Sequence, residues 1–497
     1  MKTRCHLFRG VLSSVLMGAF LALTAGLSYA QTEVDELVAA LLGNTPLVHD
    51  LAELTDEIGG RPTGSEANLQ SVEWGLAKFR SAGVTATKEA FTVPRFWLER
   101  SSNAEITGDA TFTPKVVAMT FSTGTPKEGV TAPLLDGGSG SAADFARLGE
   151  RASGAFVLVE TEVLLDIDGL FAEYANAVGV EHRAFAAAVK GVVYMSSRPQ
   201  GLLYRHNAAR QFDNNKPMLI MEREHAKRAL RLMRAGKKLD LTAKIDVRDS
   251  GAYESYNVVG EIKGSMQPEE FIVVGAHLDS WGLGTGANDN GCNAVMMIDI
   301  ARQMQKLGVK PRRTIRFVLW NGEEQGMIGS WGYTQTHAGE MNRHVVAATV
   351  DIGSGRINGF FTNGREELTQ PVAAALKPVE GLGPFTQINA PIVGTDNYDF
   401  MIQGIGNLVA NQEAYNYGPN YHAESDTFDK VDLRQLRLNA AITAALTTGF
   451  ANMDVTWQRQ NRAQVQHLID NTDLRAQMDM FNLYPDWENG RRGRTAD

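Results

Sequence analysis

Apolar residues follow two patterns along this chain, and the alternation between them predicts its elements. Short apolar runs are typical of buried strands, and apolar positions three to four residues apart indicate amphipathic helices. From Asn257 onward the two patterns take turns, which predicts a doubly wound, mostly parallel sheet flanked by helices, an α/β fold. The expected strands are 271–276, 314–320, 345–350 and 407–410, and the expected helices are 294–307, about 331–337 and about 433–453.

The region upstream predicts a second, smaller unit. Residues 155–159, 191–194 and 218–221 are short apolar strands between helical stretches, and a basic helix follows over 223–237. We interpret the basic residues of that helix as a solvated face. The elements expected before this region are helices over 34–80, interrupted by a turn at 58–64, and strands at 85–93 and 104–106.

The two ends of the chain differ from its centre in their pattern of apolar and charged residues. Lys2, Arg4 and Arg9 precede an apolar run over 11–27, and small residues follow at 28 and 30. This pattern is typical of a cleaved signal peptide, and the run is short for a bilayer span. We therefore expect export to the periplasm or the extracellular space, with no membrane anchor. The polar tail from 457 is expected to be helical, with a frayed end at 489–497.

Composition excludes several classes of function. The 497 residues are 43% hydrophobic and 21% charged, which is ordinary for a globular protein. Loss of Lys2, Arg4 and Arg9 with the signal peptide takes the formal net charge from −9 to −12. That charge disfavours nucleic acid and anionic membranes as partners. Only Cys292 remains after cleavage, so the mature chain has no internal disulfide, and we interpret Cys292 as a packing residue.

Side chains that bind metals follow three of the expected strands and lie in two further loops. Ligands in open α/β sheets bind beyond the carboxyl ends of the strands, so we expect these groups to converge. Histidines and carboxylates without a cysteine suit zinc, and two zinc ions sharing one carboxylate leave room for a water. The residues are His277, Asp279, Asp289, Glu323, Glu324, Asp351 and His422.

Two pairs within this set need separate roles. Glu323 and Glu324 are adjacent, so one is expected to bind metal while the other acts as general base on the attacking water. Asp279 lies two residues beyond His277, and strand geometry would place both side chains on one face. The carboxylate of Asp279 is therefore expected to orient the imidazole of His277.

At this point the motifs resemble a known family. His277-x-Asp279, Gly286 to Gly291, Asn321-Gly-Glu-Glu324, Asp351 and Tyr421-His422 appear in the order found in the co-catalytic di-zinc exopeptidases of clan MH, metallopeptidase family twenty-eight. Residues 277–281, 314–326 and 394–396 resemble its plasma glutamate carboxypeptidase (carboxypeptidase Q) branch. The turn 60–65 is also similar to one in the family. The likeness covers about 34–455.

The resemblance implies a role for each candidate residue. It implies that Asp289 bridges two zinc ions, that Glu323 is the general base and that Asp279 is a supporting group. The remaining ligands would divide into two sites, His277 with Asp351 and Glu324 with His422. A non-proline cis peptide is implied at Asp289–Asn290.

The resemblance also implies a domain organisation. The segments are a signal peptide (1–30), a first part of the catalytic domain (31–128), an insert similar to the protease-associated domain (129–245), a second catalytic part with the metal site (246–456) and a C-terminal helical tail (457–497). The implied function is that of a secreted zinc exopeptidase, a carboxypeptidase or dipeptidase acting on short peptides. Homodimers are common in this branch.

Three alternatives stay open. An aminopeptidase on longer peptides would use the same chemistry. A carboxypeptidase or dipeptidase needs a cation or a backbone nest for the substrate carboxylate, for which Arg365 and the arginines within 204–210 are candidates. A single-zinc acyltransferase of the glutaminyl cyclase type would not need both His277 and Asp351. A non-catalytic binding scaffold would have no need of costly buried carboxylates.

Overall fold

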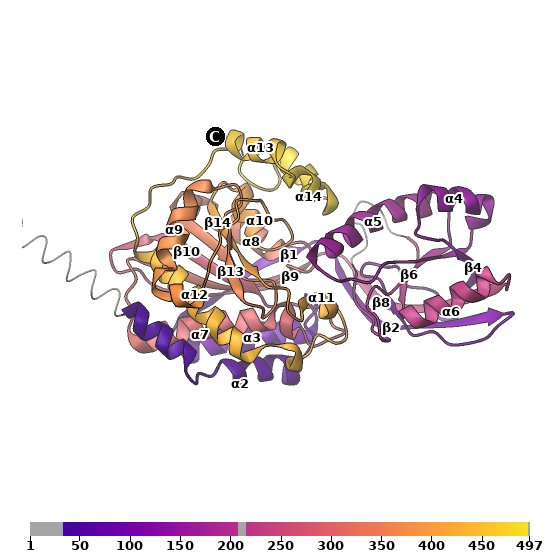
Figure 1. The fold of residues 1–497 in the computed structure, drawn as a ribbon, viewed down its shortest axis with the longest axis horizontal. Helices are drawn as coiled ribbons and strands as arrows, with labels where there is room; N and C mark the ends of the chain where they lie inside the picture. The colour runs from indigo at the N-terminus through magenta and orange to yellow at the C-terminus, as the bar shows by residue number, and fades with distance from the viewer. Residues whose placement is uncertain (1–32, 207–214, 496–497) are drawn as a thin grey trace, which may run out of the picture.

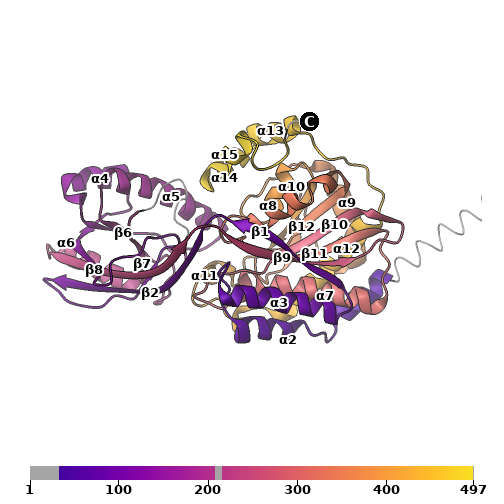
Figure 2. The same cartoon turned by 180° about the vertical axis from the view of Figure 1, so that it is seen from behind.

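The computed structural model describes residues 33–206 and 215–495, and the predicted signal peptide lies outside these ranges. Within them the chain forms two seven-stranded sheets, which build two neighbouring lobes (Figures 1 and 2). The order of the first sheet is β1 (Thr85–Val93), β9 (Tyr253–Ile262), β11 (Arg313–Trp320), β10 (Gln267–His277), β12 (His344–Thr349), β14 (Gly406–Gln412) and β13 (Ile357–Phe361).

The first sheet is mixed, so the prediction of a mostly parallel sheet was wrong. Its centre, β11-β10-β12-β14, is parallel, and the other three of its six strand pairings are antiparallel. The physical reason lies in the connections. No helix separates β9 from β10, and the chain reverses there, whereas a strand that returns in the same direction needs a longer crossover, usually through a helix.

Helices cover both faces of this sheet and explain its continuous apolar strands. Every residue of β11 is buried, as expected for a strand enclosed on both sides. The helices that cover one face are α2 (Leu47–Ala52), α3 (Glu66–Ser81), α7 (Cys292–Leu307), α9 (Thr369–Ala375) and α12 (Leu433–Asn452). The shorter helices α8 (Ile328–Thr336) and α10 (Asn397–Ile402) cover the other face.

The second sheet forms the second lobe and is also mixed. Its four strands β4, β5, β6 and β7 run parallel, while β2, β8 and β3 pair antiparallel. It extends beyond the limits expected for the insert, because β2 and β3 precede residue 129 and β8 continues past residue 245. The order is β2 (Phe96–Gly108), β8 (Leu239–Ser250), β4 (Val130–Asp136), β5 (Phe156–Val159), β6 (Gly191–Met195), β7 (Met218–Met221) and β3 (Val116–Ala118). Its likeness to a protease-associated domain stays a prediction.

Helix α5 (Ile167–Ala186) of the second lobe reaches toward the first lobe, where the C-terminal tail also lies (Figure 1). The tail is helical, as predicted, in α13 (Arg462–Asn471), α14 (Leu474–Met480) and α15 (Tyr484–Glu488). The expectation of a frayed end at 489–497 was wrong for the described residues, because Arg492 is almost fully buried. Residues 496–497 lie outside the described residues. Apolar residues of the tail pack on Met327, Val393 and Tyr398 of the first lobe.

Two smaller expectations concern the membrane and Cys292. In the described part of the chain, no helix has the length and apolar character that crossing a bilayer requires. Cys292 begins α7, is fully buried within the core of the first lobe, and has its Sγ 3.6 Å from the carbonyl oxygen of Asn288. It is a packing residue, as its position in the sequence predicted.

Candidate active site

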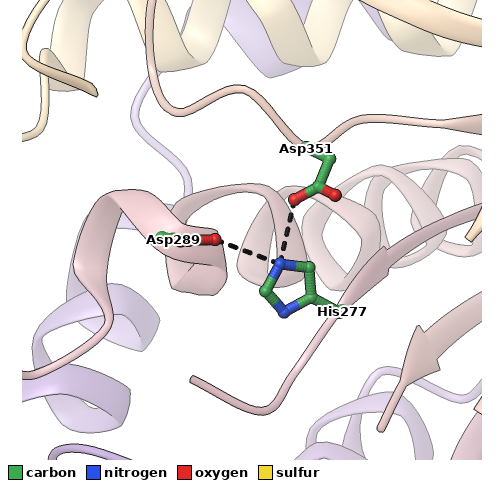
Figure 3. A group of neighbouring side chains, drawn as sticks. All are labelled: His277, Asp289 and Asp351. Atoms are coloured by element: carbon green, nitrogen blue, oxygen red, sulfur yellow. Dashed lines mark ion pairs between the residues drawn. The ribbon is translucent and has the colours of Figure 1, made fainter. Parts of the chain in front are cut away.

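The carboxyl ends of the parallel strands bring the first group of metal-binding side chains together. His277 is the last residue of β10, Asp351 follows β12, and Asp289 lies in the loop Ala287–Gly291 before α7. The Nε2 atom of His277 is 2.9 Å from Asp351 Oδ1 and 3.2 Å from Asp289 Oδ1 (Figure 3). All three side chains are almost fully buried. The convergence expected from the strand ends is therefore present.

A second group shares Asp289 with the first. His422 Nε2 lies 2.9 Å from Glu324 Oε2 and 3.4 Å from Asp289 Oδ2. The two oxygens of Asp289 thus face different histidines, Oδ1 toward His277 and Oδ2 toward His422. This is the arrangement that a carboxylate bridging two cations requires.

The composition of the two groups fits bound cations. Each group offers three ligand atoms within 4.8 Å of one another, and every residue in them is buried. Three buried carboxylates against two imidazoles leave an excess of negative charge in a region of low dielectric, which is costly without a counter-cation. Oxygen and imidazole ligands suit zinc. His277, Asp289 and Asp351 would hold one ion, and Asp289, Glu324 and His422 the other.

The two histidines differ in their electrostatic surroundings. Burial lowers the pKa of His277, but Asp351 and Asp289 outweigh it and raise that pKa well above its ordinary value. The groups that attract a proton to this ring also attract a metal cation. Burial lowers the pKa of His422 to about 4, and nearby Arg198 adds to this shift. His422 is therefore neutral near pH 7, which is the form that binds metals.

The surroundings of Glu323 raise the pKa of its carboxyl group. Glu323 follows β11 beside Glu324 and lines the same cavity. Burial raises its pKa well above the ordinary value, and the negative charges of Asp351 and Asp396 raise it further. A carboxylate with a raised pKa is a better base toward water. Asp396, at the start of α10, is itself fully buried and was given no role by the sequence.

Asp279 supports the site in a different way from the one predicted. The Nδ1 atom of His277 lies 2.9 Å from the backbone carbonyl of Asp279, whereas the nearer carboxylate oxygen is 3.7 Å away. That carboxylate instead accepts hydrogen bonds from the hydroxyl of Thr63 at 2.6 Å and from the backbone amide of Gly322 at 3.0 Å. The carbonyl orients the ring, and the side chain braces the loop that carries Glu323 and Glu324.

Several supporting residues were not found by sequence reasoning. Asp426 accepts hydrogen bonds from the backbone amides of Asn288 and Asp289, at 2.7 and 3.1 Å, and so holds the loop of the shared carboxylate. Arg61 is fully buried and donates to the carbonyls of Gly59, Leu278, Thr285 and Gly286. The only signal for either residue was the family resemblance of the motif around it, because structural arginines and aspartates have no distinctive spacing.

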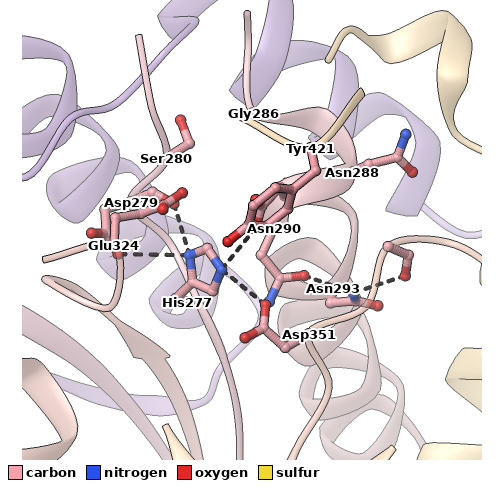
Figure 4. Close-up of polar contacts among 12 residues, drawn as sticks. His277, Asp279, Ser280, Gly286, Asn288, Asn290, Asn293, Glu324, Asp351 and Tyr421 are labelled. Atoms are coloured by element: carbon pink, nitrogen blue, oxygen red, sulfur yellow. Dashed lines mark hydrogen bonds and ion pairs between the residues drawn. The ribbon is translucent and has the colours of Figure 1, made fainter. Parts of the chain in front are cut away.

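The peptide bond Asp289–Asn290 is cis, as the resemblance implied. The loop that contains it is held by amide side chains (Figure 4). Asn290 Nδ2 donates to the carbonyl of Val350 at 2.9 Å, and Asn293 Nδ2 donates to Asn290 Oδ1 at 2.7 Å. These contacts fix Asp289 against the end of β12.

A cavity of about 350 Å³ opens beside the metal-binding groups. Glu323, Glu324, Asp351 and His422 lie at its base, and no lysine or arginine is among its described lining residues. Its remaining wall is mostly apolar, and part of it comes from the second lobe and the C-terminal tail. The residues that α5 and the end of α14 contribute are Leu170, Phe171, Tyr174, Ala177, Val178, Met480 and Phe481.

The arginines considered for a substrate carboxylate lie elsewhere. Arg365 is buried and donates to the carbonyls of Gly404 and Gln458 and to Glu367. Arg205 is paired with Glu99. Arg210 is outside the described residues. Neither of the two described candidates, Arg365 and Arg205, is among the residues that line the cavity.

An α/β sheet that carries two adjoining metal-binding groups and a neighbouring carboxylate base at its strand ends defines a metal-dependent hydrolase. Comparison with known proteins shows which family of hydrolases the chain resembles. Residues 257–447 match peptidase family M28. The matched segment contains both metal-binding groups, so the family resemblance that the motifs indicated is confirmed.

Relatives cover most of the chain. Carboxypeptidase Q of Bos taurus is 26% identical over 416 residues, which are 81% of this chain and 85% of the relative. The crystal structure of a peptidase M28 precursor from Shewanella amazonensis is 25% identical, with a TM-score of 0.78 over 87% of this chain and all of the other. A zinc aminopeptidase from Bacillus subtilis, 20% identical, shares the fold with a TM-score of 0.66 over 83% of this chain and 96% of its own.

Proposed function

We propose that this chain is a two-zinc exopeptidase that hydrolyses short peptides, dipeptides among them. The observation that carries the proposal is the pair of metal-binding groups sharing Asp289, with the buried carboxylate of Glu323 on the same cavity. Two zinc ions there would polarise the scissile carbonyl and lower the pKa of water. Asp289 would bridge the ions, with His277 and Asp351 on one side and Glu324 and His422 on the other.

In this proposal Glu323 moves the proton. It accepts a proton from the attacking water and passes it to the nitrogen of the leaving amine, so that the peptide C–N bond breaks as the C–O bond forms. Its raised pKa makes the ionised carboxylate a stronger base for that step. Asp279 keeps Glu323 in place through its hydrogen bond to the amide of Gly322. The hydroxyl of Thr63 donates to the same oxygen, Oδ2 of Asp279.

The cavity supports a small substrate with an apolar side chain. Its volume of about 350 Å³ is near the lower limit for ligand sites, so a long peptide would have to extend beyond it. Phe171 of α5 and Phe481 beyond α14 face the same space from different parts of the chain. Apolar walls favour uncharged terminal residues, since a charged side chain would lose its hydration there.

An aminopeptidase on longer peptides is the second candidate. It is favoured by one observation, the absence of lysine and arginine from the described lining, because a substrate carboxylate would then lack a cation. The α-ammonium group of a substrate would instead lie near the carboxylates that line the cavity, Glu323, Glu324 and Asp351. Recognition from the amino end is compatible with a dipeptide as well.

A zinc determination combined with a set of blocked peptides tests both candidates. We expect two zinc ions per chain and cleavage of free dipeptides. Loss of cleavage on acetylation of the amino group, but not on amidation of the carboxyl group, would favour the aminopeptidase. The reverse result would favour a carboxypeptidase. One zinc ion per chain with no peptide cleavage would contradict the proposal.

We also propose that the chain is exported with loss of residues 1–30, because their charge and apolar pattern is that of a signal peptide. Mass spectrometry of the mature protein from the expressing cells should give an amino terminus at Gln31. A chain that retains Met1 inside the cell would contradict export.

A further inference from the structure

The second lobe contacts the metal-binding histidine of one group directly. The Nδ1 atom of His422 lies 3.2 Å from the backbone carbonyl oxygen of Arg205, and the backbone amide of Arg205 donates to the carbonyl of His422 at 2.8 Å. Residues 203–206 thus lie antiparallel to residues 422–424, with a bridge between Tyr204 and Ala423. Two residues far apart in the sequence are joined by a reciprocal pair of hydrogen bonds.

These contacts decide which ring nitrogen faces the metal. A carbonyl oxygen can only accept, so the Nδ1 of His422 must carry the hydrogen in this contact. The Nε2 atom is then left with a lone pair directed toward Glu324 and Asp289. In metal sites this outer contact fixes the tautomer and the orientation of the ligand.

The backbone of His422 is held in an unusual conformation. Its φ is 55°, in the left-handed region, which costs free energy for a residue with a side chain and persists only where its surroundings enforce it. The preceding residue is held from the second lobe as well. Arg198 Nη2 donates to the carbonyl of Tyr421 at 3.0 Å, and the ring of Tyr421 stacks on that of His422 with 3.7 Å between centroids.

The other group has no such dependence. The Nδ1 of His277 is bound by the carbonyl of Asp279, two residues away in the same loop. His277, Asp289 and Asp351 all lie within the matched segment 257–447, whereas Arg198 and Arg205 lie outside it. In the described part of the chain, the outer ring nitrogen of His277 is thus held from the first lobe, and that of His422 from the second lobe.

We propose that the second lobe is a positioning element of the Glu324–His422 zinc position, acting through Arg198 and the segment 203–206. The inference rests on the proposed two-zinc site. It assigns to this lobe a part in metal binding besides its contribution of α5 to the cavity wall. The direction in which zinc affinity changes distinguishes positioning by the second lobe from a general effect of charge. Arg198 is a cation near His422, so its removal by electrostatics alone would tighten the binding of Zn²⁺, whereas loss of positioning weakens it.

The test is a zinc titration of the full-length protein with a competing chelator. In Arg198→Ala we expect one zinc to bind as in the wild type and the other to bind about 10- to 100-fold more weakly. Arg234→Ala is the matched control, because Arg234 pairs with Asp136 and Glu160 on the outside of the same lobe. It should bind two zinc ions as the wild type does.

Glu424 offers a second, independent change in case Arg198→Ala fails to fold. Its Oε1 accepts from the amide of Leu203 at 3.0 Å, and its own amide donates to the carbonyl of Leu203 at 3.0 Å. Glu424→Ala should weaken the same zinc, while Glu424→Gln, which keeps an acceptor, should restore it. A purely structural defect would lower the affinity for both ions together.

Two backgrounds identify the affected position. Asp351→Asn weakens zinc binding at the His277–Asp351 position, so that binding at the Glu324–His422 position can be measured. In this background Arg198→Ala should reduce the remaining zinc affinity. Glu324→Gln leaves the His277–Asp351 position, and there Arg198→Ala should have no effect. Folded variants that bind both ions with wild-type affinity, or lose both equally, would overturn the inference. A wild-type chain that does not bind two ions would overturn the proposed function itself.

Discussion

The guanidinium group of Arg492 donates to both carboxylate oxygens of Asp399, at 2.8 and 2.7 Å, across 93 residues of sequence. The same side chain donates to the carbonyls of Gly326 at 3.2 Å and Met327 at 3.0 Å. The amides of these two residues in turn bind the carbonyl of Glu323. The C-terminal tail therefore holds the loop of the proposed base.

Replacement of Arg492 tests this connection. Arg492→Ala leaves the carboxylate of Asp399 buried without its cation, which typically costs about 3–5 kcal/mol. We expect a lower urea midpoint, early proteolytic cleavage of the tail, and a fall in kcat/KM. Exposed Arg475, which pairs with Asp479 on α14, is the matched control, and Arg475→Ala should change none of these. Unaltered activity in folded Arg492→Ala would show that the tail does not hold the loop.

Glu323→Gln should remove turnover without removing metal. The amide has nearly the shape of the carboxylate but cannot accept a proton from water, so we expect kcat to fall about 10²- to 10⁴-fold. Zinc content, measured on the same preparation, should remain that of the wild type. A zinc-loaded variant that hydrolyses peptides at near wild-type rates would eliminate Glu323 as the base.

Removal of the metal should lower stability because three buried carboxylates lose their counter-cations. A ligand that binds only the folded state at 100 times its Kd contributes about 2.7 kcal/mol. Chelation should therefore lower the Tm, and stoichiometric zinc should restore it. Asp351→Asn, with one carboxylate neutralised, should lose less on chelation than the wild type. A Tm that does not respond to chelator would contradict a buried metal site.

Phe481→Ala tests the apolar wall of the cavity. The ring of Phe481 lies 5.6 Å from that of Tyr174, centroid to centroid, so its removal opens the wall between the tail and α5. We expect kcat/KM to fall about 10-fold or more for peptides with a large apolar terminal residue, and to change little for alanine peptides. Tyr484→Ala, in the tail but away from the cavity, is the control. Equal losses on both substrates would argue against selection by this wall.

His344 should make stability depend on pH. Burial lowers its pKa from 6.5 to about 3, and the nearby Arg316 and His337 contribute to this shift. Its ring contacts the hydroxyl of Tyr333 and the carbonyl of Glu340. Below pH 6.5 the unfolded state therefore binds a proton at His344 more tightly than the folded state does. The contribution of neutral, buried His344 to the free energy of unfolding is complete above pH 6.5 and declines as the pH falls toward 3.

The slope measures this contribution. Over that range His344 should account for up to about 1.4 kcal/mol per pH unit of the free energy of unfolding. His344→Gln, which does not titrate, should show a correspondingly shallower dependence in urea unfolding at several pH values. Identical slopes in both proteins would contradict a neutral, buried His344.

The local pattern of the sequence was sufficient for most elements. β1 begins and ends at the predicted residues, and α12 was predicted to within one residue, because strand and helix periodicities are set by backbone geometry alone. The direction of β9 was not predictable, since pairing partners depend on which connections carry a helix. The buried end of the tail was missed for a related reason. From the sequence, Arg492 would be expected to be exposed to solvent, because its partner Asp399 is 93 residues away in the chain.

The sequence alone predicted which candidate metal-binding side chains converge, because residues that follow successive parallel strands meet at one edge of the sheet. Only the tertiary structure decided what holds those residues in place. The carbonyl of Arg205 on His422, the carboxylate of Asp279 on Gly322 and the guanidinium of Arg492 on Met327 join positions that are distant along the chain. Such contacts have no period and no spacing. They exist only because the two lobes and the tail pack around one site.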